Sequence, residues 1–118
     1  MKGSELSWQV ASHPGVHAVV PSGRVDETTA SEFGERLVAE VADAAAVGAR
    51  RMTVDLSQIA YMSSRGLRAL TLAQRNAKER DLVIVLAAPS AVMREILAIS
   101  RYDMVFKVFD RIEDALVL

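Results

Sequence analysis

The stretch that decides the fold is residues 54–70, which read VDLSQIAYMSSRGLRAL. It begins like a buried strand, passes through a short apolar segment at 59–62, and then presents two adjacent hydroxyls, Ser63 and Ser64, where a helix is expected to begin. The first turn of a helix carries backbone N–H groups that have no partner inside the helix. We therefore expect an ordered, exposed serine beside such groups, which is a suitable position for a regulatory phosphate.

On both sides of this stretch, apolar residues recur with the periods of strands and helices. The expected strands are residues 6–12, 16–20, 52–56, 82–86 and 105–109, and the expected helices are residues 28–48, 64–80, 89–99 and 110–118. Pro14 and Gly15 signal a turn between the first two strands, and Pro21 to Gly23 are expected to close the second. This order predicts one α/β domain over residues 1–118, with an N-terminal hairpin and four helices on a mixed, mostly parallel sheet of about five strands.

Side-chain patterns add expectations for the first helix, the hairpin and the third helix. Thr29 and Glu32 have the three-residue spacing of a capping box at the start of the first helix. His13 and His17 flank the hairpin turn without a carboxylate cluster, so we expect exposed residues there rather than a zinc site. In the third helix, the apolar residues expected to face the core are Val92, Met93, Ile96, Leu97 and Ile99.

The composition excludes several classes of function. The chain has no cysteine, which excludes disulfides and thiolate metal sites. Its 14 basic and 15 acidic residues nearly balance, which argues against broad electrostatic binding of nucleic acid. The longest apolar run, residues 82–88, is too short to cross a bilayer, and no apolar signal core follows Met1 to Glu5. We expect a soluble, cytoplasmic protein with no metal or other cofactor and no membrane insertion.

The two serines have a structural and a functional interpretation. A serine at the N-cap of a helix contributes about 0.5–2 kcal/mol relative to alanine, so capping alone explains one of them. If Ser63 caps the helix, the hydroxyl of Ser64 faces solvent, and a phosphate there adds about −1.5 to −2 charges near neutral pH. Gly66 in the first turn permits the close approach of another segment, at a cost of about 1 kcal/mol in helix propensity. The spacing alone leaves both interpretations open.

The chain resembles the STAS family, the small domains named after sulphate transporters and anti-sigma factor antagonists, from about Leu6 to Leu118. Residues 23–26, which read Gly-Arg-Val-Asp, look like the glycine-bearing end of the second family strand, and residues 28–37 look like the start of the first helix. Residues 54–70 look like the family signature of strand, loop, (Asp or Ser)-Ser-x-Gly-Leu and helix. Pro89, the helix around Ile96 and the final apolar strand follow in family order.

This resemblance implies a partner-switching regulator without enzymatic activity, monomeric when alone. In stand-alone bacterial members, the serine before x-Gly is phosphorylated by an anti-sigma factor that is also an ATP-dependent serine kinase, and a PP2C-type phosphatase removes the phosphate. The matching residue is Ser64, with Ser63 as the alternative because it stands where many members have aspartate. The unphosphorylated protein would bind the anti-sigma factor. The implied partner-binding residues are Gly23, Arg24, Asp26, Ser63, Ser64, Arg65, Gly66 and Arg68.

Several charged residues near this motif allow two interpretations. Arg65, Arg68 and Arg75 share one side of the second helix, where they form a solvated face, contact an acidic patch of a kinase, or pair with a phosphate on Ser64. Turn chemistry and capping explain Asp26 and Asp55 most simply, and the alternative is that they help to bind a partner or a metal used by a phosphatase.

Two other functions stay open. Similar domains serve as scaffolds in stress-sensing assemblies or as small subunits of transporter ATPases, and such a protein would bind its partner constitutively. A hydrolase with Ser63 or Ser64 as its nucleophile is disfavoured, because the chain has neither a Gly-x-Ser-x-Gly elbow nor a phosphate-binding loop.

Overall fold

The computed structural model describes residues 6–118, so the expectation about Met1 to Glu5 lies outside the described residues. The elements are β1 (Ser7–His13), β2 (Val16–Val25), α1 (Ala30–Ala46), β3 (Arg51–Asp55), β4 (Ile59–Met62), α2 (Ser64–Lys78), β5 (Val83–Ala87), α3 (Ala91–Ser100), a 3₁₀ turn (Tyr102–Met104), β6 (Val108–Phe109) and α4 (Ile112–Ala115). No helix within residues 6–118 is long and apolar enough to cross a membrane.

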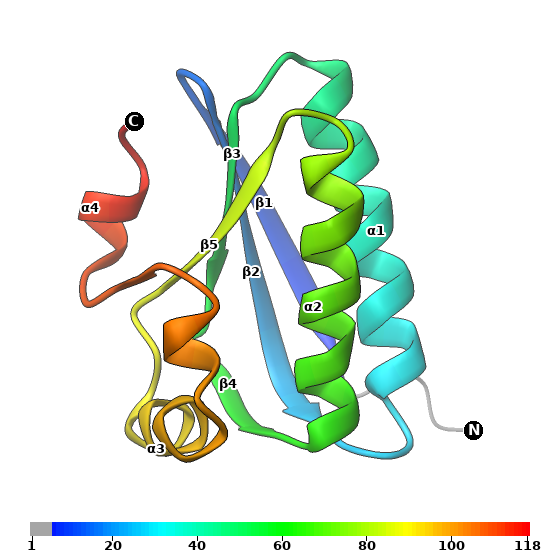
Figure 1. Ribbon diagram of the computed structural model, residues 1–118, viewed down its shortest axis with the longest axis vertical. Coiled ribbons are helices and arrows are strands. Elements are labelled where there is room, and N and C mark those ends of the chain that lie inside the picture. The colour runs from blue at the N-terminus through cyan, green and yellow to red at the C-terminus, as the bar shows by residue number, and fades with distance from the viewer. Residues whose placement is uncertain (1–5) are drawn as a thin grey trace.

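The strands form one mixed sheet in the order β1-β2-β3-β5-β6, and β4 pairs with the end of β2. Within residues 6–118, the β1–β2 hairpin is antiparallel and the other pairs of strands are parallel. Helices α1 and α2 lie side by side on one face of the sheet, α4 lies on the other, and α3 lies at the end that carries β4 (Figure 1). The predicted α/β fold, with a hairpin and four helices on a mostly parallel sheet, is confirmed.

The core lies between the sheet and the α1–α2 layer, as the apolar pattern predicts. The inner face of α2 carries Leu67, Leu70 and Ala73, all of which are buried. Gln74 also faces inward because its side chain satisfies the start of β5: Nε2 donates to the carbonyl of Ile84 at 2.9 Å, and Oε1 accepts from the amide of Ile84 at 2.9 Å. These two bonds compensate a buried polar group and tie α2 to the sheet.

The expected end of β2 at Pro21 to Gly23 is wrong, because the strand continues to Val25. Proline has no N–H to donate to a neighbouring strand. Pro21 is tolerated because β3 pairs with β2 only up to Val19 and β4 begins to pair only at Gly23, so Pro21 lies between these two parallel partners. The second partner, β4, was expected only as an apolar segment. It forms a strand because the extension of β2 offers it a free edge.

The expectations for the C-terminal third need two corrections. The last strand contains only Val108 and Phe109, and Val105 is exposed rather than part of it. In α3, Val92 and Ile99 are 47% and 83% exposed, although an inward direction was expected. Helix α3 contacts β4 and the 3₁₀ turn rather than the open sheet, so it buries a narrower face than its apolar pattern allows.

The expectation that both histidines are exposed is wrong, because His17 is buried and His13 is half-buried. Nε2 of His17 lies 2.8 Å from Oε1 of Glu40 in α1, and Arg36 donates through Nε to Oε2 of Glu40 at 2.8 Å. Burial raises the pKa of Glu40, but the hydrogen bonds from His17 and Arg36 outweigh this effect and hold the pKa below its ordinary value of 4.5. These contacts connect α1 to β2 on the covered face of the sheet.

Candidate functional site

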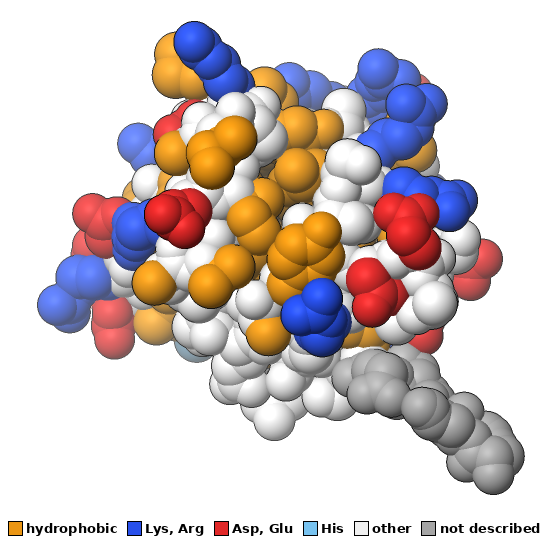
Figure 2. Space-filling model, turned by 90° about the horizontal axis from the view of Figure 1, so that it is seen from below, with side chains coloured by type: hydrophobic (Ala, Val, Ile, Leu, Met, Phe, Trp, Pro, Cys, Tyr) orange, Lys and Arg blue, Asp and Glu red, His pale blue; other side chains and the backbone are white. Residues whose placement is uncertain are grey.

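The candidate site lies where β2 and β4 end and α1 and α2 begin. Because β2 and β4 are parallel and Val25 pairs with Met62, the segments that follow them leave the sheet at the same edge. The amide of Ser63 donates to the carbonyl of Val25 at 2.7 Å and joins the two exits directly. Figure 2 views this end of the molecule, where hydrophobic side chains gather in the middle and charged side chains of both signs surround them.

The two serines of the motif have different environments. Ser63 is 7% exposed, has extended backbone and is the N-cap of α2, and its Oγ accepts a long hydrogen bond of 3.4 Å from the amide of Gly66. Ser64 is the first residue of the helix and is exposed. The geometry therefore agrees with the expectation that Ser63 caps and Ser64 faces solvent.

Gly66 permits the close approach that its position suggested. A Cβ atom at this position would lie 2.5 Å from Cγ of Met62 and 2.6 Å from Cγ1 of Val25. The approaching groups are side chains of β4 and β2 rather than backbone. Glycine at position 66 therefore allows the start of α2 to pack closely on the two strands, and this packing determines how far Ser64 lies from the sheet.

Gly23 and Arg24 belong to an irregular part of β2. The register to β4 shifts between these two residues, and Gly23 has a φ of +125°, which a side chain would disfavour. The amide of Gly23 donates to the carbonyl of Gln58 at 3.1 Å. After this shift, the exposed Arg24 places its guanidinium 4.7 Å from the ring centre of Tyr61, a cation–π contact.

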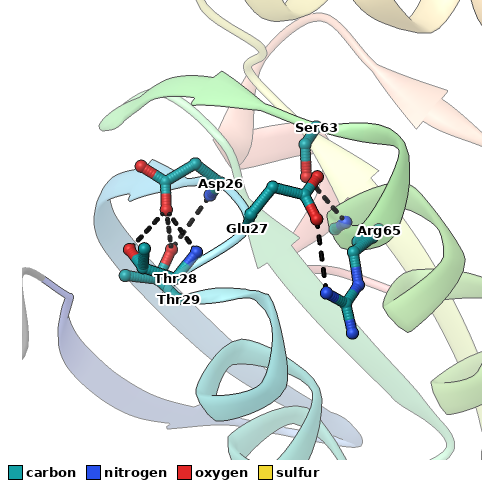
Figure 3. Close-up of polar contacts among 7 residues, drawn as sticks. Asp26, Glu27, Thr28, Thr29, Ser63 and Arg65 are labelled. Atoms are coloured by element: carbon teal, nitrogen blue, oxygen red, sulfur yellow. Dashed lines mark hydrogen bonds and ion pairs between the residues drawn. The ribbon is translucent and has the colours of Figure 1, made fainter.

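Asp26 organises the loop between β2 and α1 (Figure 3). Its Oδ1 accepts from the amide and the hydroxyl of Thr28 at 2.9 and 2.7 Å. These bonds, with those from Thr29, hold the pKa of Asp26 below its ordinary value of 3.8. The predicted capping box between Thr29 and Glu32 is not formed, because the Thr29 hydroxyl instead donates to the carbonyl of Arg24 at 2.8 Å and accepts from the amide of Asp26 at 3.0 Å.

Glu27 is a residue of this site that the sequence analysis missed. Its Oε1 lies 3.3 Å from Nη1 of Arg65, and this exposed ion pair connects the β2–α1 loop to the first turn of α2 (Figure 3). The partners are 38 residues apart in the chain. The parallel pairing of β2 with β4 brings them together, so no local pattern could have identified the pair.

Arg68 lines an open groove of about 600 Å³ between α1 and α2, together with Arg65, Glu35 and apolar residues that include Val38 and Leu72. Arg75 is exposed farther along the same helix, as expected.

Two other groups of residues do not join the site. Asp55 accepts from the amide of Ser57 at 2.9 Å, which agrees with turn chemistry. His17 is bonded to Glu40, and neither serine of the motif is hydrogen-bonded to a histidine within residues 6–118. The same described residues hold no group of three or more His, Asp or Glu that could bind a metal ion.

An N-terminal hairpin, alternating helices and strands, and a serine pair that opens the second helix define the class of small α/β domains to which this protein belongs. The comparisons identify that class, because the family model described as "Mlab, STAS domain" matches residues 8–108. The chain belongs to the STAS domain family.

Its relatives include anti-sigma factor antagonists. BtrV of Bordetella bronchiseptica, a candidate anti-sigma factor antagonist, is 33% identical over 85 residues, which cover 72% of this chain and 73% of BtrV. The crystal structure of an anti-sigma factor antagonist from Mycobacterium paratuberculosis is 25% identical with a TM-score of 0.80, and the match covers 94% of this chain and 91% of that one.

The antagonist SpoIIAA shares the fold. Its unphosphorylated form has a TM-score of 0.66 at 13% identity, and the match covers 86% of this chain and 87% of SpoIIAA. The phosphorylated Bacillus protein has a TM-score of 0.58 at 17% identity, and that match covers 86% and 90% of the two chains.

Proposed function

We propose that this protein is an anti-sigma factor antagonist whose binding is controlled by phosphorylation of Ser64. In this proposal the unmodified protein binds an anti-sigma factor that has serine kinase activity, and phosphorylation of Ser64 releases it. A PP2C-type phosphatase then restores the free serine. The homology to BtrV and to the mycobacterial antagonist supports the antagonist role.

The different burial of the two serines carries the choice of Ser64. Ser63 is buried and caps α2, so a phosphate there would have to replace the capping bond and enter a packed environment. Ser64 is exposed at the first position of the helix, where a kinase can reach its hydroxyl without unfolding the chain. A phosphate on Ser64 is therefore compatible with the fold and changes mainly the surface.

The partner is proposed to contact the edge at which Ser64 lies. Arg24, Arg65 and Arg68 contribute exposed cations, whereas Gly23 and Gly66 shape the backbone on which these side chains stand. Two further residues of the predicted surface, Asp26 and Ser63, act by holding its two loops. A dianion in the middle of such a contact must be desolvated or repelled, which weakens the complex.

The rest of the proposal follows from this role. Residues 1–118 act as a single domain that carries no catalytic residue, metal or cofactor, binds no nucleic acid and is monomeric when alone. The cytoplasm is the proposed location, since the sigma factor that the antagonist would release acts there.

Phosphorylation by the cognate kinase tests the choice of residue. Wild-type protein with kinase and ATP should gain one phosphate, and Ser64→Ala should gain none. The controls are Ser63→Ala, which should be modified if it folds, and Ser57→Ala, which removes an exposed serine outside the helix. Stable phosphate on Ser64→Ala, located by peptide mass spectrometry, would overturn the choice.

Affinity for the same kinase tests the switch. Ser64→Asp should weaken binding at least tenfold in isothermal titration calorimetry, and Ser57→Asp should not, although both add one charge to the surface. Equal affinity of wild type and Ser64→Asp would favour the constitutive alternative, in which the domain is a scaffold or a subunit of a transporter ATPase.

A further inference from the structure

Arg68 differs from the other arginines near Ser64 because, within residues 6–118, it has neither an ionic partner nor an aromatic ring contact. Arg24 lies against the ring of Tyr61, and Arg65 pairs with Glu27. Arg68 is exposed, and within residues 6–118 no carboxylate lies within ion-pair distance of its guanidinium. No carboxylate of the described residues therefore compensates the positive charge of its guanidinium.

The position of Arg68 on α2 relates it directly to Ser64. The two residues are four apart, so they lie on the same face of the helix about one turn from each other. Long side chains on helices lean toward the N-terminus and cover the preceding turn. The guanidinium of Arg68 is thus within reach of the surface at Ser64, and a planar guanidinium matches the oxygens of a phosphate in a bidentate pair.

We propose that Arg68 is the intramolecular partner of a phosphate on Ser64, in an ion pair between one residue and the fourth residue after it on α2. This inference rests on the proposed function, because it assumes that Ser64 carries the phosphate. It assigns to Arg68 a role that its neighbours do not share. Arg65 follows Ser64 directly, about 100° around the helix axis, and already pairs with Glu27.

The carboxylates of the neighbouring segments are those of Asp26, Glu27 and Glu35, and within the described residues none of them pairs with Arg68. Glu27 and Asp26 in the β2–α1 loop bring negative charge, but Oδ1 of Asp26 already accepts bonds from Thr28. Glu35 of α1 lies across the groove and is not paired with Arg68 within the described residues.

The pair has a consequence for the groove between α1 and α2. Arg68 lines this groove together with Ala69 and Leu72. When its guanidinium turns to the phosphate, its charge is compensated within the protein and is no longer offered to a carboxylate of the partner. Phosphorylation then changes two parts of the surface at once: it adds a dianion at Ser64 and removes an available cation from the groove.

The second ionisation of the phosphate measures this pair without any partner protein. Phosphoserine is placed at position 64 by genetic code expansion in wild type, Arg68→Gln, Arg68→Lys and Arg75→Gln, and each protein is titrated by ³¹P NMR. Free phosphoserine has a second pKa near 6. Loss of Arg68 should raise this pKa by about 0.2–0.4 unit relative to wild type, the scale of a helical ion pair four residues apart.

The controls separate a specific pair from a general field. Arg68→Lys should recover most of the shift because it keeps the charge. Arg75→Gln removes the same charge from the same helix, eleven residues or about 16 Å from Ser64, and should leave the pKa unchanged. Equal pKa values in wild type and Arg68→Gln, or equal shifts in Arg68→Gln and Arg75→Gln, would overturn the inference.

The outcome is also distinguishable from failure of the proposed function. If no kinase modifies Ser64 but the ³¹P shift appears, the proposed function fails and the pair stands. If Ser64→Asp abolishes binding but the ³¹P shift is absent, the switch stands and the role of Arg68 fails.

Discussion

Helices α2 and α3 begin with the same capping chemistry. Ser63 and Ser90 both have extended backbone, and each accepts a hydrogen bond from the amide three residues later, at 3.4 Å from Gly66 and 3.2 Å from Met93. Both caps satisfy one of the N–H groups that a helix start leaves open. A serine at the cap is therefore explained by the stability of the helix and is by itself no sign of function.

The two helix starts differ in what surrounds the cap. The residue after the cap is the exposed Ser64 in α2 but the exposed Ala91 in α3. The capping hydroxyl of α3 also makes a second hydrogen bond, since Ser90 donates to the carbonyl of Ile59 at 3.0 Å. The comparison teaches that capping accounts for the first hydroxyl of the pair in α2, whereas it does not account for the second.

Gly66→Ala should destabilise the protein more than any other substitution at the two helix starts, because it disturbs the packing of α2 on β2 and β4. Its new Cβ would meet Met62 and Val25, and such overpacking costs about 1–3 kcal/mol, more than the gain of about 1 kcal/mol in helix propensity. The free energy of unfolding from urea titrations measures the loss. Gly34→Ala, whose Cβ would lie 3.3 Å from that of Ala69, is the control and should lose less. A more stable Gly66→Ala would contradict the packing argument.

Removal of either capping hydroxyl should destabilise the protein, and the two losses should differ in size. Ser90→Ala and Ser63→Ala should each cost about 0.5–2 kcal/mol, with the larger loss for Ser90 because its hydroxyl also satisfies the carbonyl of Ile59. Thermal unfolding of both variants under one set of conditions gives the order. A greater loss for Ser63→Ala would mean that its long hydrogen bond understates the role of that hydroxyl.

Removal of the second hydroxyl, that of Ser64, should hardly change the stability of the protein. Ser64→Ala should change the free energy of unfolding by no more than about 0.5 kcal/mol, because its side chain is exposed and accepts no capping bond. Ala91→Ser transfers the serine pair to α3, and the kinase that modifies Ser64 should leave the transferred hydroxyl unmodified. Modification at position 91 would show that two hydroxyls at a helix start are sufficient for recognition.

Acid should affect the start of α1 and leave the hydroxyl caps of α2 and α3 intact. Hydrogen bonds from Thr28, followed by those from Thr29, hold the pKa of Asp26 below 3.8, so the charged loop is stabilised above that pH and the stabilisation is lost as pH falls through the lower folded pKa. NMR titration of the Asp26 carboxyl carbon should therefore give a value below 3.8. Thr28→Val removes one donor and should move the value upward, and a wild-type value above 3.8 would contradict the assignment.

Much of the fold was predictable because the main signals are local. The continuous apolar run of β5 and the inward face of α2 indicated their elements directly, and the turn at Pro14 and Gly15 indicated the hairpin. The errors fall where the environment decides. Val92 and Ile99 have the right period for a buried face, but α3 packs mainly against β4 and the 3₁₀ turn, and both side chains are exposed. His17 was expected to be exposed beside the hairpin turn, yet it is buried and hydrogen-bonded to a carboxylate 23 positions away.

The candidate site divides in the same way. The serine pair and Gly66 were visible in the sequence because capping and close approach require particular residue types at particular positions. Whether Ser64 or another residue carries a phosphate stays a prediction. The pair between Glu27 and Arg65 was not visible, since its partners meet only after β2 and β4 align in parallel.

The sequence by itself determined the order of the helices and of the strands other than β4, the cap at Ser63 and the glycine three residues after it, because periodicity, capping and backbone freedom act over a few neighbouring residues. Only the tertiary structure decided that β2 extends past Pro21 to hold β4, and that the loop of Asp26 and Glu27 lies beside α2. Those contacts join residues tens of positions apart, and their free energy depends on a sheet that no single segment contains.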